Sequence, residues 1–222
     1  MAHSIAIDGP AGAGKSTIAK RVARALGYVY VDTGAMYRAM AVYLLQNHVS
    51  ADDDAAVSAQ CGGADITIRY SDGEQHVFLN GSDVTGLLRS EEVGSMASRC
   101  STNRKVREKL VELQQKLAAS EDVVMDGRDI GTVVLPHAEC KIFMTADADV
   151  RAKRRCLELE QKGQSADMQK IAADIRERDE RDKTREISPL KQAEDAVLLD
   201  TSDMTIEEVT AKILEIAGLT AR

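Results

Sequence analysis

The chain has 222 residues, 44% of them hydrophobic and 29% charged, and it carries a net charge of −7 at pH 7. That length fits one domain with a buried core. The acidic surplus argues against binding to nucleic acid or to an anionic membrane. No apolar run approaches the roughly 18 residues that cross a membrane, and no basic and then apolar leader begins the chain. The cysteines, none of them in a C-x-x-C pair, are expected to be buried, reduced thiols of a cytoplasmic protein: Cys61, Cys100, Cys140 and Cys156.

The first predicted element is a short apolar strand at residues 4–8, followed by a glycine-rich loop and a helix. The loop fits the pattern G-x-x-x-x-G-K-[ST] and has the strand-to-helix context that the pattern requires. Its glycines let backbone N–H groups turn toward phosphate oxygens, and the helix N-terminus adds partial positive charge. Lys15 can reach the β- and γ-phosphates, and the Ser16 hydroxyl can bind Mg²⁺. We therefore predict a nucleotide phosphate site that comprises Gly9, Pro10, Ala11, Gly12, Ala13, Gly14, Lys15, Ser16 and Thr17.

A second strand is predicted at residues 28–31, where the sequence VDTGAMYR begins. Asp32 or Thr33 can cap the helix that follows, and Arg38 then lies about one and a half turns inside it. The acidic run at residues 51–56 is interpreted as a solvated helix start.

Residues 64–85 break the α/β pattern because they read as short alternating strands. Asp72-Gly73 and Asn80-Gly81 are typical hairpin turns. We therefore expect a small antiparallel unit inserted into the α/β core.

Three more strands are predicted at residues 122–125, 140–144 and 197–200, and helical patterns separate most of the strands. This alternation favours a parallel sheet with helices on both faces and ligands at the carboxyl ends of the strands. The sequence DGRDIGT at residues 126–132 follows one such end. It is either a structural turn or a place where the Asp126 carboxylate supports Mg²⁺ through water.

The predicted helix at residues 147–164 carries Arg151, Arg154 and Arg155 on one face. Three guanidinium groups on one face repel each other unless something negative binds them. The helix is therefore either a solvated basic helix or a lid that closes over a triphosphate.

The last helix with unusual charge runs from about residue 167 to 183. Its apolar stripe of Met168, Ile171, Ala172 and Ile175 continues, at steps of three and four, into charged residues, namely Arg178, Asp182 and Arg185. It is either a surface helix with i,i+4 ion pairs or the wall of a polar cleft for anions.

Four motifs together resemble the bacterial cytidylate kinase family of nucleoside monophosphate kinases: IDGPAGAGKST, DTGAMYR, DGRDIGT and ERDERDKTR. The resemblance covers essentially the whole chain, 1–222, and implies one α/β P-loop kinase domain. That domain would have a five-stranded parallel sheet flanked by helices, a small antiparallel β insert for the monophosphate at about 62–95 and a helical lid at about 148–166. The implied reaction is transfer of the γ-phosphoryl group of ATP, with Mg²⁺, to CMP or dCMP in pyrimidine nucleotide metabolism.

The resemblance also implies roles for particular residues. Arg38, Arg128 and Arg178 would hold the acceptor phosphate with Arg185 nearby. Asp182 would take a ribose hydroxyl, Tyr37 would line the sugar, and Thr33 would also bind CMP. Ser98, Arg107 and Asp129 would contact the base. The catalytic charges would be Lys15, Arg128, Arg151, Arg155 and Arg178. Arg154 would bind ATP together with the phosphate loop. The segment Asp200, Thr201, Ser202 would lie beside the adenine of ATP. Ser16 would bind Mg²⁺, and Asp126 would support the ion through water.

The base assignment agrees with the chemistry of cytosine, which offers an amine donor at N4 and acceptors at N3 and O2. A carboxylate and a hydroxyl accept from the amine, and a guanidinium donates to the acceptors. Uracil inverts two of these groups, and each mispaired buried group costs about 1–3 kcal/mol. Two positions depart from the family pattern: Ala11 stands where many relatives have Ser, and Arg104 where relatives often have Pro.

Two other functions remain open on the sequence. One is a kinase for another small acceptor, and the other is a P-loop switch, although the N-K-x-D motif of a GTP switch does not occur. The partners expected for the kinase are small nucleotides, ATP and CMP or dCMP, with no nucleic acid and no membrane. The chain has no sustained heptad pattern, so we expect a monomer.

Overall fold

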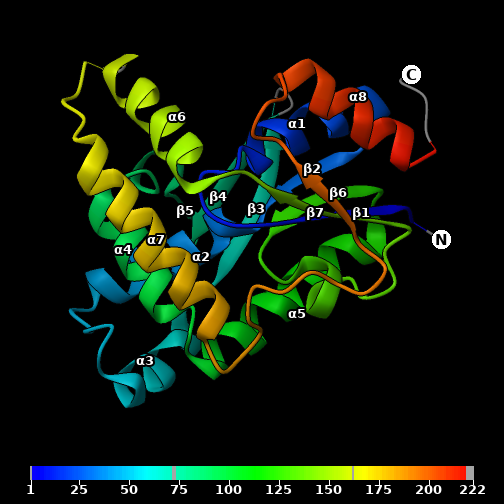
Figure 1. Cartoon of the computed structure of the whole chain (residues 1–222). Helices are drawn as coiled ribbons and strands as arrows, with labels where there is room; N and C mark the ends of the chain where they lie inside the picture. The colour runs from blue at the N-terminus through cyan, green and yellow to red at the C-terminus, as the bar shows by residue number, and fades with distance from the viewer. Residues whose placement is uncertain (1, 72–73, 162, 219–222) are drawn as a thin grey trace. The chain divides into compact units, whose positions relative to one another are not determined.

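The computed structural model describes residues 2–71, 74–161 and 163–218. It forms two compact units. One, here called the core unit, comprises Met1–Tyr30 and Glu121–Arg222, and the other, the inserted unit, comprises Val31–Ser120. Each unit is described by itself, and Figure 1 shows the elements of both.

The core unit is built around a parallel sheet with the strand order β2-β6-β1-β7-β8. The strands are β1 (Ser4–Asp8), β2 (Val29–Asp32), β6 (Val123–Gly127), β7 (Cys140–Thr145) and β8 (Val197–Asp200). β1 pairs in parallel with β6 and with β7, and β7 pairs in parallel with β8. The five predicted strands are confirmed, with ends that differ by up to two residues. The predicted fold class is confirmed with them.

Helices of the core unit pack around this sheet. They are α1 (Lys15–Leu26), α6 (Ala148–Gln161), α7 (Met168–Thr184) and α8 (Ile206–Ile216), with a short π-helical turn at Ile130–Val134. α1 packs beside α8, and α6 packs beside α7 (Figure 1). The core between α1, α8 and the sheet contains side chains that are at most 3% exposed, such as Ile7, Ile18, Val22, Ile142 and Ile213. Burial of this apolar surface provides the main driving force for folding of the unit.

Local signals explain where several helices begin. The Asp167 carboxylate accepts from the backbone N–H groups of Gln169 and Lys170 at the start of α7. Thr205 and Glu208 form a reciprocal capping box at the start of α8. Such side-chain acceptors satisfy N–H groups that have no partner inside the helix.

The inserted unit contains α2 (Thr33–Gln46), α3 (Asp54–Gln60), α4 (Glu91–Cys100) and α5 (Arg104–Ser120). Its antiparallel sheet consists of β3 (Ile66–Ser71), β4 (Glu74–Leu79) and β5 (Ser82–Asp83), with short 3₁₀ turns at Cys61–Gly63 and Thr85–Leu87. Asp32, one of the two caps that the sequence allows, caps α2, and Asp53 caps α3 within the predicted helix start at residues 51–56. The predicted turn at Asn80-Gly81 is confirmed by positive φ values of 49° and 80°. The predicted turn at Asp72-Gly73 lies outside the described residues.

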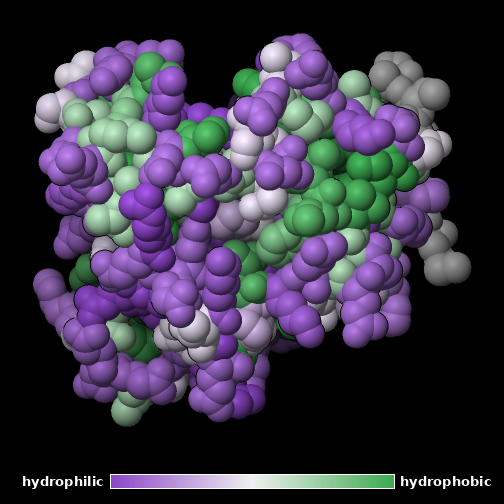
Figure 2. Space-filling view, viewed as in Figure 1, coloured by the Kyte–Doolittle hydropathy of each residue, from purple (hydrophilic) through white to green (hydrophobic). Residues whose placement is uncertain are grey.

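The surface is mainly polar, but Figure 2 shows an apolar area along the edge of the sheet at β8. Val197 and Leu198 of this strand are 43% and 57% exposed. Within the described part of the chain, no helix combines the length and the apolar character that crossing a membrane requires. The four cysteines are free thiols and are buried, as predicted.

Candidate active site

The phosphate loop connects β1 to α1, and its glycines adopt conformations that other residues rarely adopt. Gly9, Gly12 and Gly14 have φ values of 150°, 74° and 85°. A Cβ on Gly9 would overlap the carbonyl oxygen of Met144, and one on Gly12 would lie 3.5 Å from the Cβ of Arg151. The loop therefore needs glycine for its backbone shape and for close approach of its neighbours.

Lys15, the first residue of α1, is 5% exposed, and its ammonium group donates to the Pro10 carbonyl at 2.7 Å. Burial lowers its pKa to about 7. The charges of Arg128 and Arg178 act in the same direction, while those of Asp126 and Asp8 oppose it. A buried ammonium group that lies between other cations is stabilised by an added anion. Phosphate oxygens at the loop would provide that anion.

Ser16 and Asp126 form the oxygen-rich part of the site. The Ser16 hydroxyl donates to Oδ2 of Asp126 at 2.9 Å, and the Tyr30 hydroxyl donates to Oδ1 at 2.9 Å. A hydroxyl beside a carboxylate fits Mg²⁺, which prefers oxygen ligands and usually keeps several waters. No cluster of three or more His, Cys, Asp or Glu side chains that could hold a metal occurs among residues 2–71, 74–161 and 163–218.

The turn after β6 brings charged residues to α7. Nε of Arg128 donates to Oδ2 of Asp182 at 2.8 Å, and both side chains are largely buried. Arg185 lies 3.9 Å from Asp129 and 4.0 Å from Asp182. Burial raises the pKa of Asp182, but the charges of Arg128, Arg178 and Arg185 more than offset this and hold it below the usual value. The cluster carries more positive than negative charge, as an anion site requires.

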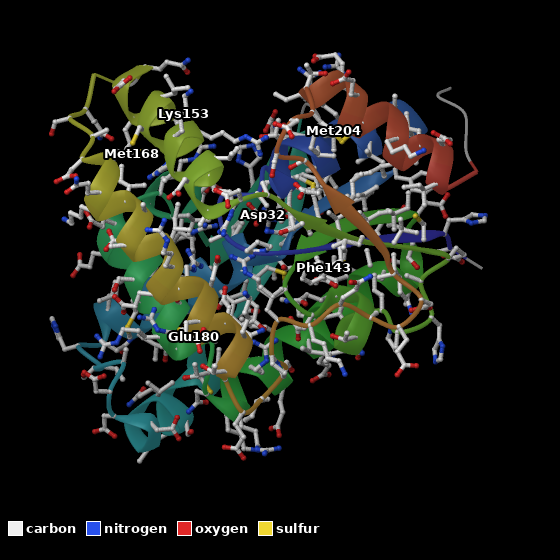
Figure 3. The ribbon with its side chains drawn as sticks, viewed as in Figure 1. Asp32, Phe143, Lys153, Met168, Glu180 and Met204 are labelled. Atoms are coloured by element: carbon white, nitrogen blue, oxygen red, sulfur yellow. The ribbon has the colours of Figure 1, made fainter. Side chains whose placement is uncertain are left out.

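The helix α7 follows the predicted change from apolar to charged residues, with one correction. Ala172, Asp182 and Arg185 are buried and Arg178 is partly buried, but Met168 is 40% exposed and lies beside α6 at the start of the helix (Figure 3). Its sulfur is 3.5 Å from the Cys156 thiol of α6. The predicted apolar stripe therefore fails at its first residue, because α6 rather than the sheet is the neighbour there.

The three arginines of α6 have different surroundings. Arg151 is 4% exposed, and it donates to both carboxylate oxygens of Asp179 and to the Ala11 carbonyl of the phosphate loop. Arg154 donates to the Thr201 carbonyl at 2.6 Å, in the segment expected beside adenine. Arg155 is about half exposed and pairs with Glu158. The idea that three adjacent guanidinium groups need an outside anion is thus incomplete, since each has a protein partner.

The remaining predicted acceptor residues lie in the inserted unit. Thr33, Tyr37 and Arg38 belong to α2, Ser98 is buried on α4, and Arg107 is buried on α5. The Arg107 guanidinium lies 5.4 Å from the centre of the Tyr37 ring and donates to the Ser101 carbonyl at 3.1 Å. The structure thus brings Tyr37 and Arg107 together.

Asn103 determines how the chain enters α5. Its Oδ1 accepts from the Val106 N–H, and its Nδ2 contacts Asp54 and Ser58 of α3. Arg104 is therefore accommodated as the first residue of α5 without a proline. The sequence analysis missed Asn103, although a side chain of its type before a helix is a capping signal. It also missed Asp179, which lies between predicted residues of α7.

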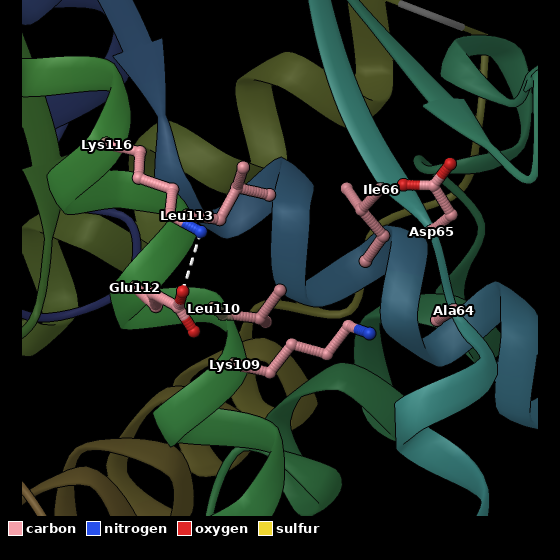
Figure 4. A pocket seen from close by; sticks show the side chains of 8 residues that line it. All are labelled: Ala64, Asp65, Ile66, Lys109, Leu110, Glu112, Leu113 and Lys116. Atoms are coloured by element: carbon pink, nitrogen blue, oxygen red, sulfur yellow. Dashed lines mark hydrogen bonds and ion pairs between the residues drawn. The ribbon is translucent and has the colours of Figure 1, made fainter.

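A cavity of about 220 Å³ lies elsewhere, between α5 and β3 (Figure 4). Its lining includes Ile66, Leu110 and the ion pair of Lys116 with Glu112, whose charged atoms are 2.6 Å apart. Ala64, Asp65 and Ile66 of the lining belong to the predicted insert at about 62–95, but none of the lining residues is a predicted site residue. It therefore does not change the location of the candidate site.

Known proteins are similar in sequence to nearly the full chain. The family model described as cytidylate kinase matches residues 5–218. The chain belongs to the cytidylate kinase family. A cytidylate kinase of Caldicellulosiruptor bescii is 53% identical over 96% of this chain and 94% of that protein. One of Lactobacillus gasseri is 51% identical over 96% of this chain and 92% of that protein.

Among solved structures, a shikimate kinase of Bacteroides thetaiotaomicron has a TM-score of 0.50 and 14% sequence identity. The match covers 98% of this chain and 99% of that one. At that identity the likeness shows the fold alone, and it agrees with a parallel sheet that carries a phosphate loop. The family membership rests on the sequence relatives.

Proposed function

We propose that this protein transfers the γ-phosphoryl group of ATP to CMP and dCMP, giving ADP with CDP or dCDP. Membership of the cytidylate kinase family supports the reaction. The observation that carries the proposal is the buried cluster of Arg128, Asp182 and Arg185, together with the charges of Arg128 and Arg178 that lower the pKa of Lys15 in the phosphate loop. Transfer between two phosphates needs several cations at one point, because both reactants are anions.

The chemistry needs little beyond position and charge. An oxygen of the CMP phosphate is already anionic near neutral pH and attacks the γ-phosphorus in line, so no general base is needed. Lys15, Arg128 and Arg178 neutralise the charge that is shared among the oxygens of the transferring group. Ser16 would hold Mg²⁺, with Asp126 acting through water, and the ion would neutralise part of the charge of the ATP phosphates.

The donor and acceptor sites are proposed as follows. ATP binds residues 9–17 with Arg154, and Arg151, Arg154 and Arg155 belong to a lid at about 148–166. CMP binds through its phosphate to Arg38, Arg128 and Arg178, with Arg185 nearby, and through its base to Ser98, Arg107 and Asp129. Asp182 takes a ribose hydroxyl, Tyr37 lines the sugar, and Thr33 also belongs to the CMP site. The monophosphate-binding insert spans about 62–95, within a single kinase domain over 1–222.

We also propose that the protein acts as a cytoplasmic monomer on small nucleotides, and not on nucleic acid or membranes. Four buried free thiols fit a reducing compartment. The net charge of −7 is unfavourable for polyanionic partners.

Purified protein tests the proposal when it is incubated with ATP, Mg²⁺ and CMP and the nucleotides are separated by chromatography. We expect CDP and ADP to appear in equal amounts. ATP should stay largely intact when CMP is omitted, because water is a poor acceptor in a closed site. Loss of ATP at the same rate with and without CMP would contradict the proposal.

Thermal unfolding separates this kinase from a P-loop switch. CMP alone should raise the melting temperature, because a ligand at 100 times its Kd stabilises the folded state by about 2.7 kcal/mol. A switch would respond to a nucleoside triphosphate and not to CMP. Orotidine monophosphate, which has a carboxylate on its base, serves as the control ligand and should have a much smaller effect.

A further inference from the structure

Asp8, the last residue of β1, makes two contacts that the proposed reaction has not used. It is 5% exposed, and each carboxylate oxygen accepts from a different backbone amide. Oδ1 accepts from the N–H of Ile130 at 2.8 Å, and Oδ2 accepts from the N–H of Gly131 at 2.7 Å. These two amides begin the π-helical turn, where N–H groups have no partner within the turn itself.

The backbone of Asp8 also holds the start of the same loop. Asp8 is the register partner of Gly127, the last residue of β6, in the parallel pairing of β1 with β6. Only Arg128 and Asp129 lie between Gly127 and the two amides that the carboxylate binds. A single residue therefore fixes both ends of a loop whose two central side chains are proposed to bind the acceptor.

We propose that Asp8 is a positioning residue for the acceptor, holding the loop of Arg128 and Asp129 in the geometry that binds CMP. This inference rests on the proposed function. Asp8 touches neither substrate in this proposal and acts through the two residues of the loop. Because Gly9 follows directly, the same stretch of backbone carries the donor phosphate loop and the support of the acceptor loop.

The surroundings leave little spare room beside the contact. A Cβ on Gly131 would lie 3.4 Å from Oδ2 of Asp8, an ordinary contact distance, and 3.2 Å from Cδ of Lys141, which would have to shift slightly. Burial raises the pKa of Asp8 to about 6, and the two backbone hydrogen bonds and Lys15 oppose this rise while Asp129 adds to it. The fold thus keeps a carboxylate in a place where burial disfavours its charge, next to the two amides that use it.

The test is Asp8→Asn, which keeps the shape but turns one acceptor into a donor that faces an N–H group. We expect the KM for CMP to rise roughly 10- to 100-fold, the loss that one unsatisfied buried contact produces. The KM for ATP should change less than about threefold, and the preference for CMP over UMP should fall because Asp129 contacts the base. A residue with a merely structural role would shift both KM values together.

Asp122→Asn is the matched control. The Asp122 carboxylate also accepts from a backbone amide, that of His3 at 2.7 Å, but at the other end of β1. The KM values of the Asp122→Asn variant and its preference for CMP over UMP should equal those of the unchanged protein. Gly131→Ala, which places a methyl group between the Asp8 carboxylate and the Lys141 side chain and keeps the charge, should raise the KM for CMP in the same direction as Asp8→Asn. The Gly131→Ala variant also tests the inference if the Asp8→Asn variant folds poorly.

Amide hydrogen exchange tests the geometry without any activity. The amides of Ile130 and Gly131 should exchange at least about tenfold faster in Asp8→Asn and at the original rate in Asp122→Asn. Unchanged exchange, or equal rises in both KM values, would overturn the inference. Absence of CMP turnover in the unchanged protein would instead overturn the proposed function, and the exchange rates would still decide whether Asp8 holds the loop.

Discussion

Arg178 is the residue whose removal should affect the chemistry most directly. It lies on α7, and its charge lowers the pKa values of both Lys15 and Asp182. We expect Arg178→Ala to lower kcat by roughly 100- to 1,000-fold, the usual effect of removing one group that stabilises developing charge. The fold should remain intact, since Arg178 is only partly buried.

The measurement is steady-state turnover with CMP together with the melting temperature of each variant. Arg176→Ala is the control, because Arg176 is an exposed residue of the same helix that pairs with Asp149. It should retain nearly full turnover. Normal turnover in Arg178→Ala would remove Arg178 from the mechanism.

Asp182, a member of the same cluster, makes the stability of the protein depend on pH. Its pKa in the folded protein is held below the usual value, so the folded state binds its proton less tightly than the unfolded state does. The stability that it contributes is present above the unfolded pKa of about 3.9 and is lost as pH falls further. The melting temperature of the Asp182→Asn variant should therefore fall less between pH 6 and pH 3 than that of the unchanged protein.

Thermal unfolding at a series of pH values checks this expectation. Asp174→Asn, a change at an exposed carboxylate of α7, is expected to follow the unchanged protein at every pH. If Asp182→Asn and the unchanged protein lost stability in parallel, Asp182 would not contribute to acid unfolding.

At the scale of the elements, the phosphate loop is the segment with the strictest backbone requirement. Gly9→Ala would drive a Cβ into the Met144 carbonyl, and backbone atoms on both sides cannot move away cheaply. We expect this change to lower the melting temperature strongly and to abolish ATP binding. Calorimetric titration with ATP and thermal unfolding are the measurements.

Gly94→Ala is the matched change inside α4. A Cβ there has no other described atom within 4 Å, apart from the helix's own backbone and the adjoining residues. It should stabilise the protein by about 0.5–1 kcal/mol, because alanine favours a helix interior. Equal melting temperatures for the two alanine variants would show that the loop tolerates a side chain at Gly9.

The strands and most helices could be predicted because their signals are local. Short apolar runs located β1 and β8, Asp32 was one of two candidate caps for α2, and the acidic run at residues 51–56 marked the start of α3. The π-helical turn at Ile130–Val134 could not be predicted, since it depends on a carboxylate that lies 122 residues earlier in the chain. Likewise, the partner of Arg151 could not be read from charge spacing on α6 alone, because Asp179 belongs to another helix.

At the scale of the whole molecule, the two halves of the candidate site differ in how far the sequence reveals them. The donor loop is one continuous segment, so Lys15 and Ser16 follow from a single pattern. The acceptor residues come from α2, α4, α5, α7 and the turn after β6. Helical periodicity indicated Arg178, Asp182 and Arg185, but no local pattern connects the residues of different elements. Only the resemblance to a family identified the whole set, and the roles of these residues stay predictions.

The proposed function requires that this kinase selects its acceptor by hydrogen bonds to the cytosine base. Turnover with ATP and Mg²⁺, measured by ADP release, tests it most directly when CMP, dCMP, UMP, AMP, GMP and no acceptor are compared. We predict high kcat/KM for CMP and dCMP, values roughly 10- to 1,000-fold lower for UMP, and negligible turnover with the purine nucleotides. Equal turnover of CMP and UMP would contradict the base reading, and turnover with none of them would contradict the acceptor assignment itself.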